Sequence, residues 1–137
     1  MERVLILVGL AAVVAALVLA GRLVARRRLN GLHSLSTDVL WDALGTGPDG
    51  RPTVVAFSTP GCAACWSAQK PALDALQQRA RDQIRLIEID VAEQPRVAHA
   101  LGVLTVPATV VLDGSGAVLA ANQGFATVDG LGAQLGV

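Results

Sequence analysis

Both cysteines of the chain, Cys62 and Cys65, lie in the stretch STPGCAACW and are separated by only two alanines. Two thiols at this spacing are compatible with reversible disulfide exchange, with half of a metal site, or with no chemistry at all. Disulfide exchange needs one thiolate that attacks a substrate disulfide and a second thiol that resolves the mixed disulfide. The residues around the pair favour one of these three readings.

Cys62 is predicted to lie where a buried strand meets the N-terminus of a helix. The segment TVVAFS (53–58) is apolar at consecutive positions, which is typical of a strand covered on both faces, and Pro60 and Gly61 suit a tight turn after it. Free N–H groups and the helix dipole stabilise a thiolate at such a position, and they can lower the thiol pKa below its usual ~8.5. We therefore expect Cys62 to be the attacking sulfur and Cys65, one helical turn later, to be the resolving thiol.

A zinc site is the main chemical alternative for the two cysteines. Structural zinc normally has four protein ligands, and the other candidate ligands are His33, in a predicted linker, and His99, in a helix remote in sequence. A complete site would then have to be shared between two chains. A CxxC pair near a βαβ pattern is itself a redox signature, so we expect redox chemistry with no metal and no bound cofactor. A purely binding role stays open.

The elements that must position the cysteines follow from apolar periodicity and from turn residues. In chain order we expect a helix over 38–44 capped by Ser36 or Thr37, a strand over 53–58, a helix from near Cys62 bent at Pro71, a strand over 84–91, a helix over 94–103, a hairpin over 108–124 and a helix over 128–135. Strands separated by helices imply parallel crossovers, and the hairpin adds an antiparallel edge. This order predicts a small mixed sheet with helices on both faces.

The N-terminal segment is predicted to be a membrane anchor. The chain has 137 residues, no net charge and 53% hydrophobic residues, and residues 4–21 carry no charge. The apolar stretch 4–25 is long enough to span a bilayer and exceeds the ~7–15 residues of a signal-peptide core, although Val18-Leu19-Ala20 resembles a cleavage site. We expect an anchor with a basic flank at 1–29, a linker at 30–36 and one soluble domain at 37–137.

The charges flanking the stretch predict its orientation. Arg22, Arg26, Arg27 and Arg28 follow it, whereas Arg3 before it is offset by Glu2. Basic residues favour the cytoplasmic side, so a single-pass protein with a cytoplasmic domain is expected. The extracytoplasmic placement is the alternative, because disulfides persist there. The arginine run is expected to contact anionic lipid. Nucleic-acid binding is not expected, since the domain has no basic stripe and few aromatic residues.

From about residue 36 to the C-terminus, the sequence resembles the thioredoxin family. The resemblance rests on three segments, VVAFSTPGCAAC, IEIDVAEQPRVAHALGVLTVPATVVLDGSGAVL and QGFATVDGLGAQL. It implies a thioredoxin-like α/β fold, with a mixed sheet of four to five strands and helices on both faces. It also implies thiol–disulfide oxidoreductase activity, with Cys62 as the nucleophile and Cys65 as the resolving thiol.

The resemblance also implies a substrate-binding surface around the cysteines. Pro107 would be in the cis conformation, so that the backbone of Val106 could pair with an extended substrate segment. Gly124 would match the family's glycine near the binding face. Gly61 and Trp66 flank the two cysteines and are included in this surface.

Several positions depart from the family pattern. Ala56 occupies the position of the family's buried aspartate, and Gly61 that of the tryptophan before the first cysteine, whereas Trp66 follows the second. Ala63-Ala64 replaces the usual Gly-Pro, and Pro71 comes one residue later than the usual helix proline. These changes are expected to alter the reduction potential.

Together these features predict a membrane-anchored thiol–disulfide oxidoreductase. Its expected partners are protein thiol or disulfide substrates, a thioredoxin reductase or membrane electron donor, and the lipid bilayer. The alternative is a tethered, chaperone-like module that binds clients through the Pro107 face without redox cycling.

Overall fold

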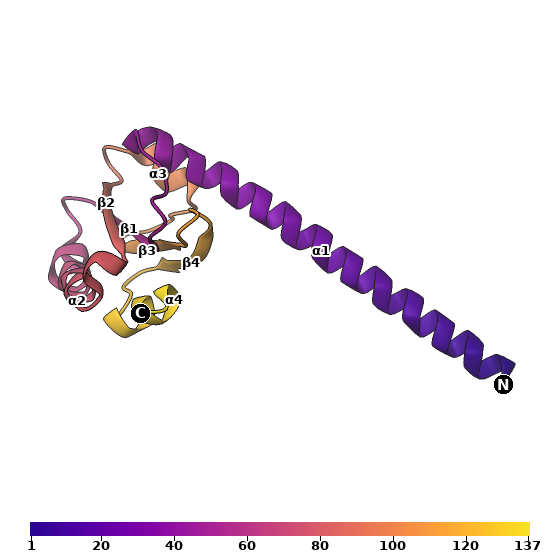
Figure 1. Ribbon diagram of the computed structural model, residues 1–137. Helices are drawn as coiled ribbons and strands as arrows, with labels where there is room; N and C mark the ends of the chain where they lie inside the picture. Colours follow the sequence, from indigo (N-terminus) through magenta and orange to yellow (C-terminus); the bar gives the residue numbers. More distant parts are fainter. The chain divides into compact units, whose positions relative to one another are not determined.

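The computed structural model describes residues 1–26 and 37–137, and the chain divides into two units, Met1–Leu32 and His33–Val137. The first unit belongs to α1 (Glu2–Leu44), drawn in indigo to purple (Figure 1). Its segment Glu2–Arg26 has a mean hydropathy of 2.9 and no side chain buried within the protein. Its length and composition are sufficient to cross a membrane, although a signal sequence meets the same criteria.

The helix expected over 38–44 is the last part of α1, which ends before Gly45 in the left-handed conformation (φ 65°). Thr37 lies inside α1 and is therefore not the N-terminal cap that the sequence predicted, because the helix begins at Glu2. The predicted cap Ser36 and the predicted linker at 30–36 lie outside the described residues.

Four strands form one mixed sheet in the second unit, with the order β2-β1-β3-β4. They are β1 (Thr53–Ser58), β2 (Arg85–Asp90), β3 (Ala108–Leu112) and β4 (Val118–Gln123). β1 is an inner strand whose first five residues are all buried, in agreement with its unbroken apolar run. The sheet has four strands, the lower of the two numbers predicted.

The strand directions correct one prediction. β1 and β2 are parallel, but β3 pairs with β1 in the antiparallel direction, with Phe57 opposite Ala108. The helix between β2 and β3, α3 (Pro95–Ala100), has six residues and rises only ~9 Å, whereas a six-residue strand spans ~20 Å. The chain therefore returns to the sheet at the edge where β2 ended, and β3 runs in the opposite direction.

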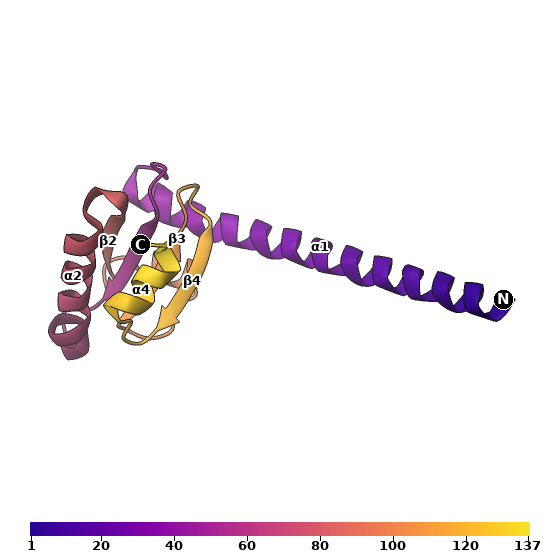
Figure 2. The same cartoon turned by 60° about the horizontal axis from the view of Figure 1, so that its bottom comes forward.

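Helices cover both faces of the sheet and enclose two apolar cores. The end of α1 and α3 pack on one face, where Leu40 and Val97 belong to one apolar cluster with Val55 and Phe57. On the other face lie α2 (Lys70–Ala80) and α4 (Val128–Leu135), with a short 3-10 turn (Arg81–Gln83) after α2 (Figure 2). Because side chains alternate along β1, Val54 and Ala56 belong to this second core, together with Leu73, Leu76, Ala80, Leu131 and Leu135.

Candidate active site

The two cysteines form a disulfide at the start of the helical segment that follows β1. Cys62 directly precedes the first helical residue, Ala63, and its N–H donates to the carbonyl of Thr59 at 3.1 Å, which closes the turn. The Cα atoms of Cys62 and Cys65 are 5.3 Å apart. Cys62 is partly exposed, whereas Cys65 is only 4% exposed. Cys62 is therefore the more accessible of the two residues.

A backbone donor points at the accessible sulfur. The N–H of Cys65 donates to Sγ of Cys62 at 3.1 Å, as the N–H of the third helical residue often does toward the side chain that caps a helix. In the reduced protein this donor and the helix dipole both favour a negative charge on Cys62. The arrangement suits a nucleophilic Cys62 thiolate.

The Pro107 loop lies at the same edge of the sheet as the cysteines. The Val106–Pro107 peptide bond is cis, Pro107 is buried, and the next residue, Ala108, pairs with Phe57 near the end of β1. The N–H of Gly124 donates to the carbonyl of Pro107 at 2.8 Å, and Gly124 has a left-handed φ of 89° that favours glycine. The sheet thus brings Val106, Pro107 and Gly124 together.

Gly61 and Trp66 lie on either side of Cys62 in sequence. Gly61 forms part of the exposed turn, and a Cβ atom there would meet no neighbouring atom within 4 Å. Trp66 is 51% exposed, and its Nε1–H donates to the carbonyl of Pro60 at 3.3 Å. The indole is therefore anchored on the turn that presents Cys62.

A π-helical turn, η1 (Cys65–Gln69), begins at the second cysteine, leads into α2 and was not predicted. A π-turn accommodates one more residue than an α-turn and frequently occurs at functional sites. The extra residue accounts for the late position of Pro71, which lies in the first turn of α2. That late proline was the only sequence signal of the turn.

The π-turn directs Gln69 into the protein, a contact that the sequence did not reveal. Gln69 is 3% exposed. Its Nε2 donates to the carbonyl of Ala126 at 3.1 Å, and its Oε1 accepts from the N–H of Ala126 at 2.9 Å. This pair of hydrogen bonds joins the helical segment of the cysteines to the loop that contains Gly124.

The described residues contain no group of three or more His, Cys, Asp and Glu side chains that could hold a metal ion. His99 is exposed on α3, and His33 lies outside the described residues. The two cysteines are joined to each other in a disulfide.

A mixed four-stranded sheet with a CxxC disulfide at a helix start and a proline loop at the same edge defines a thioredoxin-like protein. The family model described as thioredoxin matches residues 46–135. The chain therefore belongs to the thioredoxin family.

Solved structures support the same fold. A structure described as a malarial protein is 24% identical with a TM-score of 0.58, over 63% of this chain and 94% of that one. Thioredoxin-2 of a malaria parasite, described as a component of the protein secretion machinery, is 25% identical with a TM-score of 0.56, over 61% and 79%. A mutant thioredoxin from Halobacterium salinarum is 24% identical with a TM-score of 0.57, over 64% and 74%. A comparison with curated proteins gave no significant match.

Proposed function

We propose that the protein is a membrane-anchored thiol–disulfide oxidoreductase. The observation that carries the proposal is the unequal burial of the disulfide-bonded pair, with Cys62 accessible at a helix start and Cys65 enclosed behind it. An accessible thiolate can attack a substrate, and an adjacent enclosed thiol can resolve the product before a second substrate molecule does. Membership of the thioredoxin family supports this class of activity.

In the reductive direction, the Cys62 thiolate attacks one sulfur of a substrate disulfide. The substrate S–S bond breaks, its other sulfur leaves with the electron pair and takes a proton from water, and a mixed disulfide joins Cys62 to the substrate. Cys65 then loses its proton and attacks Sγ of Cys62, which expels the second substrate thiolate. Two electrons pass to the substrate, and a reductase or a membrane electron donor restores the dithiol. No bound cofactor takes part.

The substrate would bind as an extended segment across Gly61, Trp66, Val106, Pro107 and Gly124. Within the described part of the chain, no hydrogen bond occupies the backbone N–H or C=O of Val106, so these groups are available for strand-like pairing. Two apolar side chains near this loop in sequence, Leu104 and Phe125, are 89% and 52% exposed. They would contact apolar residues on either side of the substrate cysteine.

We further propose that residues 4–25 lie in the lipid bilayer. The support is the length and apolar character of Glu2–Arg26. The arginines that follow the stretch favour a cytoplasmic domain, and the extracytoplasmic placement is the alternative.

The activity is tested with single cysteine variants of the full chain in detergent, using reduction of a protein disulfide as the assay. Cys62→Ser should abolish turnover, because no thiolate attacks the substrate. Cys65→Ser should accumulate mixed disulfides that a non-reducing gel resolves. Gln78→Ala is the control, because it changes an exposed residue on α2 and leaves the segment between and around the two cysteines unchanged. Turnover at the wild-type rate in Cys62→Ser would refute the mechanism.

A second candidate function is client binding without redox cycling, and the exposed Trp66, Leu104 and Phe125 favour it. Under this alternative, the Cys62→Ser/Cys65→Ser double variant would bind an unfolded client as tightly as the wild type. Under the oxidoreductase proposal, the double variant loses the covalent complex and retains only weak, rapidly reversible binding.

A further inference from the structure

The resolving step needs a group that takes a proton from Cys65. The step rests on the proposed function, because only a redox pair has to resolve a mixed disulfide. Cys65 is almost fully buried, and apolar surroundings disfavour a thiolate. Bulk water has little access to its proton, so an acceptor inside the protein would speed the step.

A small cavity reaches Cys65 from the side of α2 and β2. Its volume is about 20 Å³, which is enough for one water molecule. Two charged side chains, Lys70 and Glu88, line it together with Cys65 and Trp66. The cavity therefore offers a path of one water molecule between the buried sulfur and a carboxylate.

The sheet register places Glu88 at this cavity. Glu88 on the edge strand β2 pairs with Ala56 on β1, and Ala56 also lines the cavity. The small methyl group of Ala56 leaves space beside Cys65 that a larger side chain would fill. The neighbours of Glu88 in β2, Ile87 and Ile89, belong to the core on the opposite face of the sheet. Glu88 therefore faces α2 and the cysteines.

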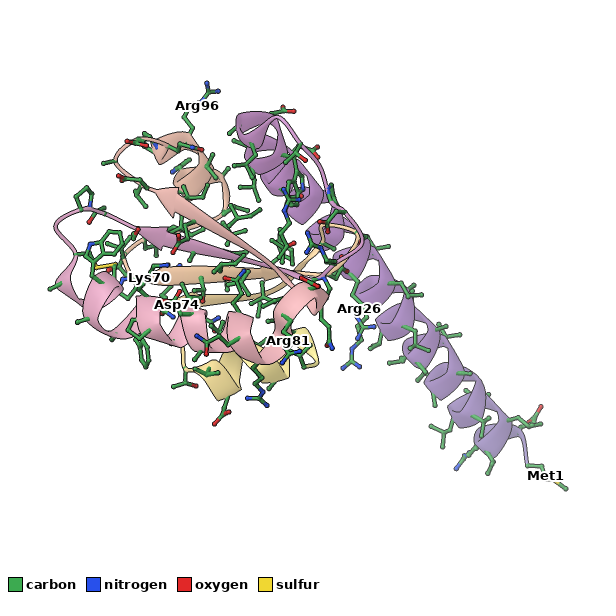
Figure 3. The ribbon with its side chains drawn as sticks, turned by 60° about the vertical axis from the view of Figure 1, so that its left-hand side comes forward. Met1, Arg26, Lys70, Asp74, Arg81 and Arg96 are labelled. Carbon is green, nitrogen blue, oxygen red and sulfur yellow. A yellow bond between two sulfur atoms is a disulfide. The ribbon has the colours of Figure 1, made fainter. Side chains whose placement is uncertain are left out.

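Lys70 holds the carboxylate in place. Its Nζ lies 3.3 Å from Oε1 of Glu88 and 3.2 Å from Oδ1 of Asp74, one turn along α2. These two carboxylates, with the hydrogen bond to Asp74 first, raise the pKa of Lys70 above its usual value, so Lys70 is a cation at neutral pH. Figure 3 shows Lys70 and Asp74 on α2, with the disulfide in yellow at the N-terminal end of the same helical segment.

Within the part of the chain that the structure describes, the other residues that line the cavity are uncharged. β1 contributes Ala56, Phe57 and the hydroxyl-bearing Ser58, and the π-turn contributes Gln69, whose amide is bound to Ala126. Asp74 contacts Lys70 from outside the cavity lining. Among the described residues that line the cavity, Glu88 supplies the one carboxylate, and Lys70 is a cation that pairs with it.

We propose that Glu88, held by Lys70, accepts the proton of Cys65 through one water molecule in this cavity. In the step, the Cys65 S–H bond transfers its proton to the water while the water gives a proton to the Glu88 carboxylate. The Cys65 thiolate then forms the bond to Sγ of Cys62, and the substrate thiolate leaves with its electron pair. The protonated carboxyl returns the proton to solvent, and no further oxidant or reductant is consumed.

The test follows the two thiolate releases that occur when the reduced full-length protein, in detergent, reacts with a bis(nitrobenzoate) disulfide. The first release reports attack by Cys62 and depends on reagent concentration. The second reports attack by Cys65 on the mixed disulfide and does not. Glu88→Gln should slow the second release at least tenfold at pH 7 and leave the first within twofold. The deficit should shrink toward pH 9, where hydroxide can take the proton directly.

Asp74→Asn is the matched control. Asp74 and Glu88 both pair with Lys70, and both side chains are half exposed, but only Glu88 lines the cavity. Asp74→Asn should leave the second release within twofold of the wild-type rate.

If Glu88 acted only through its negative charge, Glu88→Gln would change the rate of the second release in the opposite direction from the proposal. Loss of a nearby carboxylate makes the Cys65 thiolate easier to form. An electrostatic role alone therefore predicts that the Glu88→Gln variant resolves the mixed disulfide at a rate equal to or faster than that of the wild type. That result would overturn the role of Glu88 and leave the proposed function intact. Absence of both releases in the wild type would instead overturn the proposed function and this inference with it.

Discussion

Cys62 and Cys65 lie on one short segment but in different environments, and the proposed mechanism gives them different roles for that reason. Cys62 precedes the helix, accepts a hydrogen bond from the Cys65 N–H and is partly exposed, whereas Cys65 is buried in the first turn. The assignment of these two residues from sequence needed only residue type and spacing. Lys70 and Glu88 were not assigned, because they are eighteen residues apart and meet only through the pairing of β1 with β2.

Asp113 illustrates how one carboxylate stabilises the turn between β3 and β4. Its Oδ1 accepts from the N–H of Ser115 at 2.9 Å, the hydroxyl of Ser115 at 2.6 Å and the N–H of Ala117 at 3.0 Å. These donors, the Ser115 hydroxyl first, lower the pKa of Asp113. Because the pKa of Asp113 is lower in the folded than in the unfolded protein, its ionised carboxylate stabilises the fold at pH values above the unfolded-state pKa. This stabilisation is lost as the pH falls through the folded-state pKa.

We therefore expect Asp113→Asn to reduce the free energy of unfolding by about 1 kcal/mol at pH 7, because hydrogen bonds to a charged acceptor become neutral ones. The difference from the wild type should diminish as the pH is lowered to about 3. Urea unfolding at both pH values measures it. Asp42→Asn serves as the control, since Asp42 makes no side-chain hydrogen bond within the described part of the chain. An equal loss at both pH values would contradict this origin of the stability.

At the scale of elements, periodicity predicted the strands of the domain to within a few residues and placed a helix in each expected interval, although the helix over 38–44 is the end of α1, which begins at Glu2. The strand over 53–58 and the helix over 128–135 have the predicted bounds. The strand direction of β3 and the π-turn were not predicted. The first depends on the length of α3 relative to the sheet, and the second on a single extra residue that leaves the apolar spacing of Leu73 and Leu76 intact.

The π-turn has a measurable contribution to stability through Gln69. We expect Gln69→Ala to lower the free energy of unfolding by about 2–4 kcal/mol, because two hydrogen bonds are lost and the buried N–H and C=O of Ala126 are left unpaired. Gln78→Ala on the exposed face of α2 should stay within about 0.5 kcal/mol of the wild type. Denaturant unfolding measures the free energy of unfolding of both variants. An equally small loss in Gln69→Ala and Gln78→Ala would contradict a stabilising role of the Gln69 hydrogen bonds.

At the scale of the whole molecule, the chain combines an apolar helical segment with a thioredoxin domain. The apolar segment could be identified from composition alone, because its uncharged stretch matches bilayer thickness. Its fate as an anchor or a signal sequence depends on processing, which length and hydropathy do not encode.

We expect the full chain to stay in the membrane fraction after washing with alkaline carbonate, because about 20 apolar residues partition strongly into the bilayer. A chain that lacks residues 1–29 should be recovered in the soluble fraction. The N-terminus of the purified protein, determined by mass spectrometry, provides the decisive control. A mature chain that begins at Gly21 would identify a cleaved signal peptide and contradict the anchor.

Equilibration of the full-length protein in detergent with thiol buffers of defined potential, followed by trapping and counting of free thiols, tests the central claim most directly. The proposal predicts one reversible two-electron transition from a form with two free thiols to a form with none. This transition should disappear in both Cys62→Ser and Cys65→Ser. A midpoint near about −270 mV would accord with a cytoplasmic reductant, and one near about −120 mV with an extracytoplasmic oxidant. If no intramolecular disulfide forms at any potential, the protein is not a thiol–disulfide oxidoreductase.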